Sequence, residues 1–352
     1  MNKNPIPLLL LNELSSSSDD SEISSEDEYI NINKKINNIN DLIELGKLYN
    51  PKNKYNIDLL KIYNILNPLN KLKNMIGLTN VKKTIVNQII YFLNDFDDSN
   101  NMMHTVIQGP PGVGKTMLGK IIGEIYYGLG ILKGQESKKR DRDFNNKNKF
   151  IFNIIKRSDL IGKYLGHTAI KTQKAIDKCS GGVMFIDEAY SLGNKEGRDS
   201  YSKECIDTIN QNLTENKANF LCIIAGYKNA LDKCFFAYNE GLRRRFTFIY
   251  TIDNYTAKEL REIFILMINK NKWDYDKIPI KFFKKNYSCF KNSAGDMETL
   301  FLNCKIKHSR RVFGTESIKK KLTIEDINEG FKIFVDNRKE VKEDDSWKLL
   351  YI

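Results

Sequence analysis

Short apolar runs alternate with longer stretches of helical periodicity in the middle of the chain, between residues 72 and 252. Apolar runs bounded by glycine or polar residues are typical of buried strands, and apolar residues repeated every three or four positions are typical of amphipathic helices. The predicted strands are 105–107, 150–155, 183–186, 220–227 and 247–252; the predicted helices are 79–94, 117–127, 168–179 and 201–213. Strands that alternate with helices predict a parallel sheet covered on both faces, which is a three-layer αβα domain.

The regions on either side of this domain have different patterns. After residue 252 the strand signal stops, and helical patterns follow at 256–271, 296–304 and 324–334. We therefore predict a small helical lid domain at 253–337 and a charged C-terminal tail at 338–352. Residues 1–71 are predicted to be an acidic, serine-rich and largely disordered region, in which short helical patches suggest a small appendage.

The most acidic part of that region, residues 13–28, is open to three interpretations. It is a solvated tail, or a tail regulated by phosphorylation of serines beside acidic residues, or an acidic arm that folds over a basic surface of the same protein.

The first predicted strand is joined to its helix by Gly-Pro-Pro-Gly-Val-Gly-Lys-Thr, which matches the phosphate-binding loop Gly-x-x-x-x-Gly-Lys-Ser/Thr. Glycines let backbone N–H groups approach phosphates closely, and the helix N-terminus favours anions. Lys115 can reach the β- and γ-phosphates of a nucleotide, and Thr116 can offer its hydroxyl to Mg²⁺. The predicted nucleotide-binding residues of the loop are Gly109, Pro110, Pro111, Gly112, Val113, Gly114, Lys115 and Thr116.

A second nucleotide signature ends the strand at 183–186, where Asp187 and Glu188 follow four apolar residues. In open α/β sheets ligands gather at the carboxyl ends of the strands, so both carboxylates are expected beside the phosphate-binding loop. We predict that Asp187 holds Mg²⁺ and that Glu188 orients or deprotonates the attacking water.

The composition argues against zinc sites and disulfide bonds. The six cysteines include no Cys-x-x-Cys pair and the three histidines stand apart, so we expect neither a zinc site nor a disulfide framework. We expect a soluble intracellular protein, in the cytoplasm or nucleus (or the host cytoplasm, if viral), without a membrane segment. The net charge of +12 permits nucleic acid without identifying it. The basic insert 133–149 is either a surface loop or a contact for an acidic client or nucleic acid.

With these residues in view, the chain resembles the AAA+ ATPases, and specifically the CbbX/CfxQ-like branch. The resemblance covers about residues 72–335. Beside the phosphate-binding loop, it rests on these motifs: Ile76-Gly77-Leu78, Arg157 to Leu160, Lys163 to Ala169, Gly181 to Leu192, Ala225 to Tyr227, and Gly241 to Phe246.

The resemblance implies a homo-oligomeric ring, usually a hexamer, with ATP bound between subunits. It implies that Arg245, or else Arg243, reaches the γ-phosphate of the neighbouring subunit; a basic turn at the domain edge is the alternative. It also implies that the segment Tyr164, Leu165 and Gly166 is a pore loop that grips a client polypeptide; a buried aromatic residue is the alternative. Three further residues join the predicted nucleotide site: Ile76, Gly77 and Met117.

Two departures from the family pattern concern the sensing of the γ-phosphate. The lid segment that carries an arginine in the family reads Ser293 to Leu300 here and contains none. Arg310 or Arg311, later in the chain, is the only substitute we consider. The polar first sensor of the family falls near Tyr227.

From these features we expect an ATP-dependent, Mg²⁺-requiring remodeller of a protein client. A nucleic-acid motor is one alternative, although the chain has no helix-turn-helix signature and no zinc module. A nucleotide-switched scaffold without turnover is the other, and the missing lid arginine motivates it.

Overall fold

The computed structural model describes residues 29–96, 102–134, 149–164, 166–193, 199–217, 220–315 and 320–343. Four predicted features therefore lie outside the described residues: the acidic segment 13–28, Leu165, most of the basic insert and the end of the C-terminal tail. Among the described residues, no helix is both long enough and apolar enough to span a membrane.

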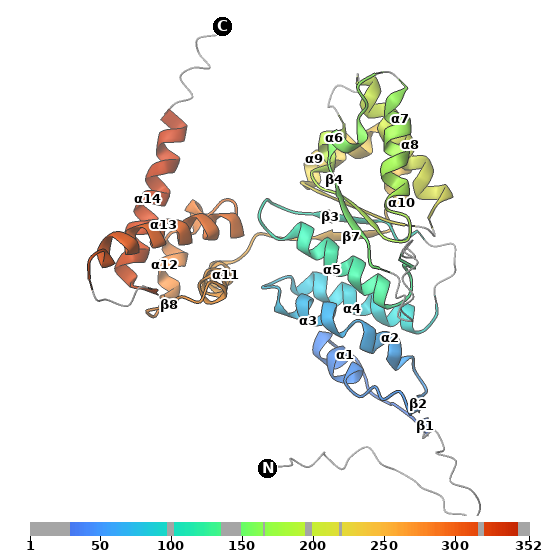
Figure 1. Cartoon of the computed structure of the whole chain (residues 1–352), viewed down its shortest axis with the longest axis horizontal. Helices are drawn as coiled ribbons and strands as arrows, with labels where there is room; N and C mark the ends of the chain where they lie inside the picture. Colours follow the sequence, from blue (N-terminus) through green and yellow to red (C-terminus); the bar gives the residue numbers. More distant parts are fainter. Residues whose placement is uncertain are drawn as a thin grey trace, which may run out of the picture.

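A sheet of five parallel strands in the order β4-β5-β6-β3-β7 lies at the core of the larger domain, on the right in Figure 1. The strands are β3 (Thr105–Gln108), β4 (Phe152–Ile155), β5 (Val183–Ile186), β6 (Leu221–Gly226) and β7 (Phe248–Thr251). All residues of β5 and β6 are buried, as central strands covered on both faces must be. The predicted parallel sheet is confirmed, and each strand lies within one or two residues of the predicted bounds.

Alternate residues of the strands enter two separate hydrophobic cores, because successive side chains point to opposite faces of a sheet. Val183 and Phe185 pack with helices α4 (Thr79–Leu93) and α5 (Lys115–Gly128). Met184 and Ile186 pack with α7 (His167–Asp177) and α8 (Ser200–Glu215) on the other face. The predicted three-layer arrangement follows directly from this alternation (Figure 1).

Short helical segments connect the strands on the α7–α8 side of the sheet. α6 (Arg157–Leu160) follows β4, and η1 (Ala189–Leu192) follows β5. Between β6 and β7 the chain forms α9 (Lys228–Ala230), η2 (Leu231–Phe235), η3 (Phe236–Tyr238) and α10 (Glu240–Arg245).

The N-terminal helices α1 (Ile39–Gly46), α2 (Leu59–Asn64) and α3 (Leu66–Asn74) pack beneath α4 and α5 (Figure 1). Asn38 caps α1 with its side chain, and β1 (Tyr29–Ile30) pairs with β2 (Lys54–Tyr55). Buried residues of α1 and α3 belong to the same core as α4 and α5. The expectation of a largely disordered region up to residue 71 is therefore wrong for residues 29–71, because their apolar residues are buried against the nucleotide domain.

The C-terminal lid contains α11 (Ala257–Lys270), α12 (Ile280–Lys285), η4 (Tyr287–Cys289), α13 (Ala294–Val312) and α14 (Ile324–Glu343). The short parallel pair β8 (Asp274–Tyr275) and β9 (Lys321–Leu322) was not predicted, because two-residue strands leave no alternating pattern. The predicted helical lid is confirmed, with a short helix, α12, that the pattern did not reveal.

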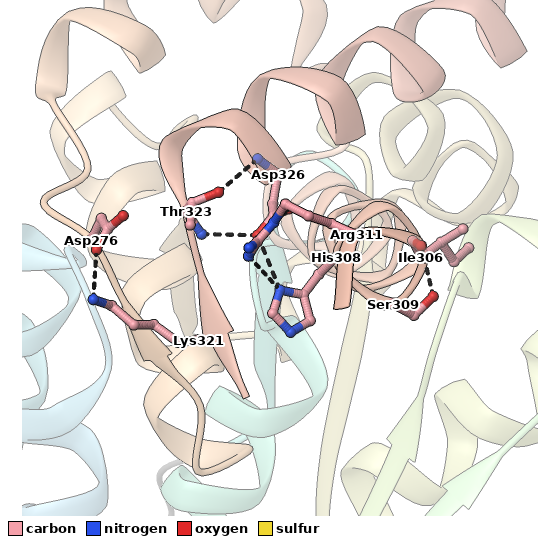
Figure 2. A network of polar contacts seen from close by, with 8 residues as sticks. All are labelled: Asp276, Ile306, His308, Ser309, Arg311, Lys321, Thr323 and Asp326. Atoms are coloured by element: carbon pink, nitrogen blue, oxygen red, sulfur yellow. Dashed lines mark hydrogen bonds and ion pairs between the residues drawn. The ribbon is translucent and has the colours of Figure 1, made fainter. Parts of the chain in front are cut away.

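One buried carboxylate ties α13 to α14 (Figure 2). Asp326 accepts hydrogen bonds from Arg311 Nη2 at 2.9 Å and from the Thr323 N–H at 3.0 Å, and its Oδ2 lies 3.0 Å from His308 Nδ1. Burial alone would raise the pKa of Asp326, but these hydrogen bonds outweigh it and hold that pKa well below its ordinary value. Arg311 is thus occupied within the lid.

Beside the central sheet, a buried histidine connects three elements of the nucleotide domain. His104, directly before β3, accepts the Cys222 N–H at Nδ1 (3.1 Å), and its Nε2 lies 3.0 Å from the carbonyl oxygen of Leu213. The ring is therefore neutral and carries its proton on Nε2. Burial lowers the pKa of His104 to about 4, against the smaller raising effect of the bond to Leu213.

This histidine predicts a pH-dependent stability. The folded pKa of about 4 lies below the unfolded value of 6.5, so the unfolded state takes up the proton first as the pH falls. The contribution of the neutral His104 ring to the free energy of unfolding is fully present above about pH 6.5 and is lost as the pH falls towards 4. Between pH 7 and pH 5 we expect His104 to cost roughly 2 kcal/mol of unfolding free energy. In His104→Gln, which keeps a donor and an acceptor but does not titrate, urea unfolding should lack this component; equal pH slopes for the two proteins would contradict the assignment.

Candidate active site

The phosphate-binding loop connects the carboxyl end of β3 to the start of α5. Gly112 and Gly114 have φ angles of +68° and +88°, a conformation that favours glycine. A Cβ atom on Gly109 would lie 2.6 Å from the carbonyl oxygen of Ile252 at the end of β7. The glycines of the motif are therefore required by the backbone path as well as by close approach to a phosphate.

Lys115 begins α5 and is only 7% exposed. Its ammonium donates hydrogen bonds to the carbonyl oxygens of Gly109 (3.2 Å) and Pro110 (2.9 Å), and it lies 5.3 Å from the centre of the Tyr227 ring. Burial lowers the pKa of Lys115, while the nearby carboxylates of Glu188 and Asp187 oppose the shift. The structure thus places one buried cation at the mouth of the loop, directly beside the residue at the expected first-sensor position.

Thr116, on the first turn of α5, meets Asp187, which directly follows β5. The Thr116 hydroxyl donates to Asp187 Oδ2 at 3.2 Å. Hydroxyl and carboxylate oxygens are hard ligands that suit Mg²⁺, which usually keeps several waters and takes further oxygens from substrate phosphates. Within the described ranges no group of three or more His, Cys, Asp or Glu residues could form a complete metal cage. The donors present therefore fit a Mg²⁺ ion shared with a nucleotide.

Glu188 follows Asp187 in an unusual backbone conformation, with a φ of +50°. Its N–H donates to Asp187 Oδ1 at 3.0 Å. A left-handed conformation in a residue other than glycine costs on the order of 1 kcal/mol and is typical of functional sites. Burial raises the pKa of Glu188, Lys115 lowers it, and Asp187 raises it further, with a net rise. A carboxylate with a raised pKa is a better general base near neutral pH.

Arg243 and Arg245 lie away from these four residues. Arg245 Nε donates to Thr214 Oγ1 at 2.6 Å and its Nη1 donates to the carbonyl oxygen of Gly241 at 2.8 Å. Arg243 pairs with Asp232 and lies over the ring of Phe236, 4.4 Å from its centre.

The separation follows from the register of the sheet. Arg245 stands three residues before Phe248, which pairs with Thr105, and Gly109 stands four residues after Thr105. The arginines therefore enter the sheet at one end and the phosphate-binding loop leaves it at the other, separated by four-residue strands, or about 13 Å at about 3.3 Å per residue. Both arginines make their contacts within this end of their own chain, with Thr214, Gly241 and Asp232.

A pocket of about 230 Å³ lies beside the loop, between the start of α4 and the hinge that leads from β7 to α11. Its size suits part of a nucleotide, since whole drug-sized ligands need about 300 Å³ or more. It is lined by Leu78, Thr79, Asn80, Val81, Thr251, Ile252, Asp253, Asn254, Tyr255, Thr256 and Glu259.

Ile76 and Gly77 lead directly into this pocket, and a Cβ atom on Gly77 would lie 2.5 Å from Glu259 Oε1. Met117, on the first turn of α5, is 61% exposed. The hinge residues were missed from the sequence; the signal that could have marked them is the capping box of Thr256 and Glu259, which starts α11 directly after the pocket.

The predicted pore loop, Tyr164 to Gly166, lies only partly within the described residues. Tyr164 is 67% exposed and its ring lies 5.4 Å from that of His167, edge to face. Gly166, with a φ of +78°, forms the N-cap of α7, and Leu165 lies outside the described residues. The alternative that Tyr164 is a buried aromatic is therefore wrong.

Within the described part of the lid, the contact with the phosphate-binding loop is made by backbone atoms at the start of α13. The Ala294 N–H, at the start of α13, donates to the carbonyl oxygen of Gly112 at 3.2 Å. Arg310 and Arg311 lie near the other end of this 19-residue helix, roughly 24 Å away at about 1.5 Å per residue. The suggestion that either replaces the lid arginine is wrong for this reason, and Arg311 is also bound to Asp326.

Comparison with known proteins agrees with this geometry. Residues 105–254 match the ATPase family associated with various cellular activities (AAA). A CfxQ-like protein of Acanthamoeba polyphaga mimivirus is 43% identical over 90% of this chain and 76% of its own length. A CfxQ homolog of Galdieria sulphuraria is 33% identical over 60% of this chain and 66% of its own length.

More distant relatives share smaller parts. Stage V sporulation protein K of Bacillus subtilis is 34% identical over 49% of this chain and 48% of its own length. The ESX-3 secretion system protein EccA3 of Mycolicibacterium smegmatis is 36% identical, and this chain spans only 26% of it.

The solved FIGL-1 AAA domain resembles the fold, with a TM-score of 0.52 at 18% identity over 76% of this chain and 88% of that structure. The family profile and the mimivirus relative together show that the chain belongs to the CfxQ-like branch of the AAA ATPases.

Proposed function

We propose that this chain binds ATP with Mg²⁺ and hydrolyses it in a site shared between two copies. The observation that carries the proposal is the convergence of Lys115, Thr116, Asp187 and Glu188 at the carboxyl ends of β3 and β5, with Thr116 and Asp187 3.2 Å apart. The AAA family match and the CfxQ-like relatives support the same reaction class.

Each residue of this group has a distinct task. Lys115 and the glycine-rich backbone bind the phosphates, and Thr116 with Asp187 hold Mg²⁺. When bound, the metal ion neutralises charge on the phosphate oxygens. Glu188 accepts a proton from the water that attacks the γ-phosphate, a task that its raised pKa suits.

The remaining requirement is a cation for the charge that develops on the transferred phosphoryl group. Arg245 is our first choice and Arg243 the second, but both precede β7, at the opposite end of the sheet from the loop of their own chain. An arginine finger supplied by a neighbouring copy meets this requirement, and we therefore propose a homo-oligomeric ring such as a hexamer. The exposed Tyr164 supports a client polypeptide as the substrate of remodelling.

The role of Glu188 predicts a variant that binds ATP but does not hydrolyse it. In Glu188→Gln the amide cannot accept the proton, so the hydrolysis rate should fall by at least about 100-fold while ATP affinity stays within a few-fold. Lys115→Ala should lose affinity as well, and Glu298→Gln, on an exposed turn of α13, should leave both unchanged. Turnover in Glu188→Gln at the natural rate would remove Glu188 from the mechanism.

The position of Arg245 predicts complementation between two inactive variants. Arg245→Ala should lose hydrolysis by roughly 1,000-fold, and Lys115→Ala should be inactive for lack of nucleotide. When the two variants assemble together, the intact phosphate-binding loop of an Arg245→Ala subunit can face the intact Arg245 of a Lys115→Ala subunit. Activity should therefore return. The measurement is phosphate release as the mixing ratio varies, with the exposed Arg244→Ala as an active control. An inactive mixture, despite co-assembly shown by light scattering, would contradict a site completed in trans.

A further inference from the structure

Two consecutive carbonyl groups of the phosphate-binding loop are held from outside the loop. The Tyr255 hydroxyl, in the hinge, donates to the carbonyl oxygen of Val113 at 3.0 Å. The Ala294 N–H, in the lid, donates to the carbonyl oxygen of Gly112 at 3.2 Å. Val113 is fully buried and Tyr255 is 8% exposed, so water cannot readily replace the tyrosine bond.

Fixing a carbonyl also fixes the N–H of the same peptide group. In a trans peptide the C=O and N–H bonds point in opposite directions, and none of the described peptides is cis. The bond from Tyr255 therefore turns the Gly114 N–H away from the hinge, and the bond from Ala294 turns the Val113 N–H away from the lid. Both N–H groups belong to the part of the motif that surrounds phosphate.

The hinge tyrosine is itself held by the lid. The Tyr287 hydroxyl, in η4, donates to the carbonyl oxygen of Tyr255 at 2.8 Å. Tyr255 thus links the lid to the loop, because its backbone carbonyl accepts from Tyr287 and its side-chain hydroxyl donates to Val113.

The lid packs so closely against Gly112 that there is no room for a side chain at this position. A Cβ atom there would lie 2.3 Å from the carbonyl oxygen of Asn292 and 3.1 Å from the backbone nitrogen of Gly295. Ser293, between them, is 3% exposed and has a φ of +52°, which is strained for a residue other than glycine. Tight packing and retained strain indicate that the lid backbone is held in one position against the loop.

The side chain at the position where the family carries an arginine cannot perform this task. Asp296, on the first turn of α13, is 2% exposed, accepts the Asn292 N–H at 2.8 Å and pairs with Arg338 of α14. It faces its own lid helices and supports the backbone turn at 292–295.

From these contacts we infer that Tyr255 is a positioning residue for the nucleotide, and that the lid acts on the phosphate site through Tyr255 and the backbone of Ala294. The inference rests on the proposed nucleotide-binding function and adds how that site is regulated. A lid that moves away breaks both bonds and releases two phosphate-binding N–H groups. By linkage, a bound nucleotide must hold the lid with the same coupling free energy.

The test uses the full-length chain and a fluorescent ADP analogue as the probe, so it needs no hydrolysis. Tyr255→Phe removes only the hydroxyl and should weaken the Kd about tenfold, because the loop must then be ordered by the nucleotide itself. Tyr287→Phe, on a partly exposed residue that tolerates the change, should weaken it about threefold. The double variant should match Tyr255→Phe alone, because Tyr287 acts only through Tyr255.

The matched control is Tyr250→Phe, which loses a buried hydroxyl bonded to Gln88 of α4 rather than to the loop. It should lower the melting temperature and leave the Kd unchanged. Hydrogen exchange supplies an independent readout: ADP should slow exchange of the amides at 292–296 in the natural chain and much less in Tyr255→Phe.

The outcomes separate this inference from the proposed function. If the natural chain binds no ADP analogue, the proposed function fails. If it binds ADP while Tyr255→Phe and Tyr287→Phe bind equally well, or if ADP leaves exchange at 292–296 unchanged, the coupling is wrong and the proposed function stands.

Discussion

The register of three parallel strands determines where the chemistry of this protein can occur. β6 lies between β3 and β5, and Ile224 pairs with Val106 on one side and Ile186 on the other. Asp187 and Glu188 therefore leave the sheet level with the last residues of β3, two strand spacings or about 10 Å from the start of the phosphate-binding loop. The loop spans this distance as it leads into α5, so that Thr116 on the first turn of α5 lies beside Asp187. The same register puts the arginines that precede β7 at the opposite end of the sheet.

Features that depend on local pattern could be predicted from the sequence. The strands and the loop were found because apolar runs, glycine spacing and the Asp-Glu pair are local signals. The N-terminal helices were underestimated, because α1 and α3 are buried by contacts with α4 and α5 that no local pattern shows. Other features join residues that are far apart in the chain: the contact of Lys115 with Tyr227, the hinge pocket, and the hydrogen bond from Ala294 to Gly112. Such contacts appear only when the fold is known.

In this protein the lid still contacts the phosphate-binding loop, although its segment 293–300 lacks the arginine of the family. Asp296 occupies the region of the usual arginine but is paired with Arg338 inside the lid. The contact with the loop is made by the backbone N–H of Ala294 and by the Tyr255 hydroxyl, neither of which carries a net charge. In the proposed mechanism this arrangement orients the N–H groups of the loop, and Lys115 with an arginine of the neighbouring copy stabilises the γ-phosphate. Loss of the lid arginine is thus compatible with turnover.

The central claim is that each active site is completed by a second copy of the chain. The most direct measurement is steady-state ATP hydrolysis per subunit over a wide range of protein concentration. The account predicts a rate that rises cooperatively and then saturates as subunits associate, because Arg243 and Arg245 lie at the opposite end of the sheet from the phosphate-binding loop of their own chain. A rate per subunit that stays constant down to concentrations at which the chain is monomeric would contradict it.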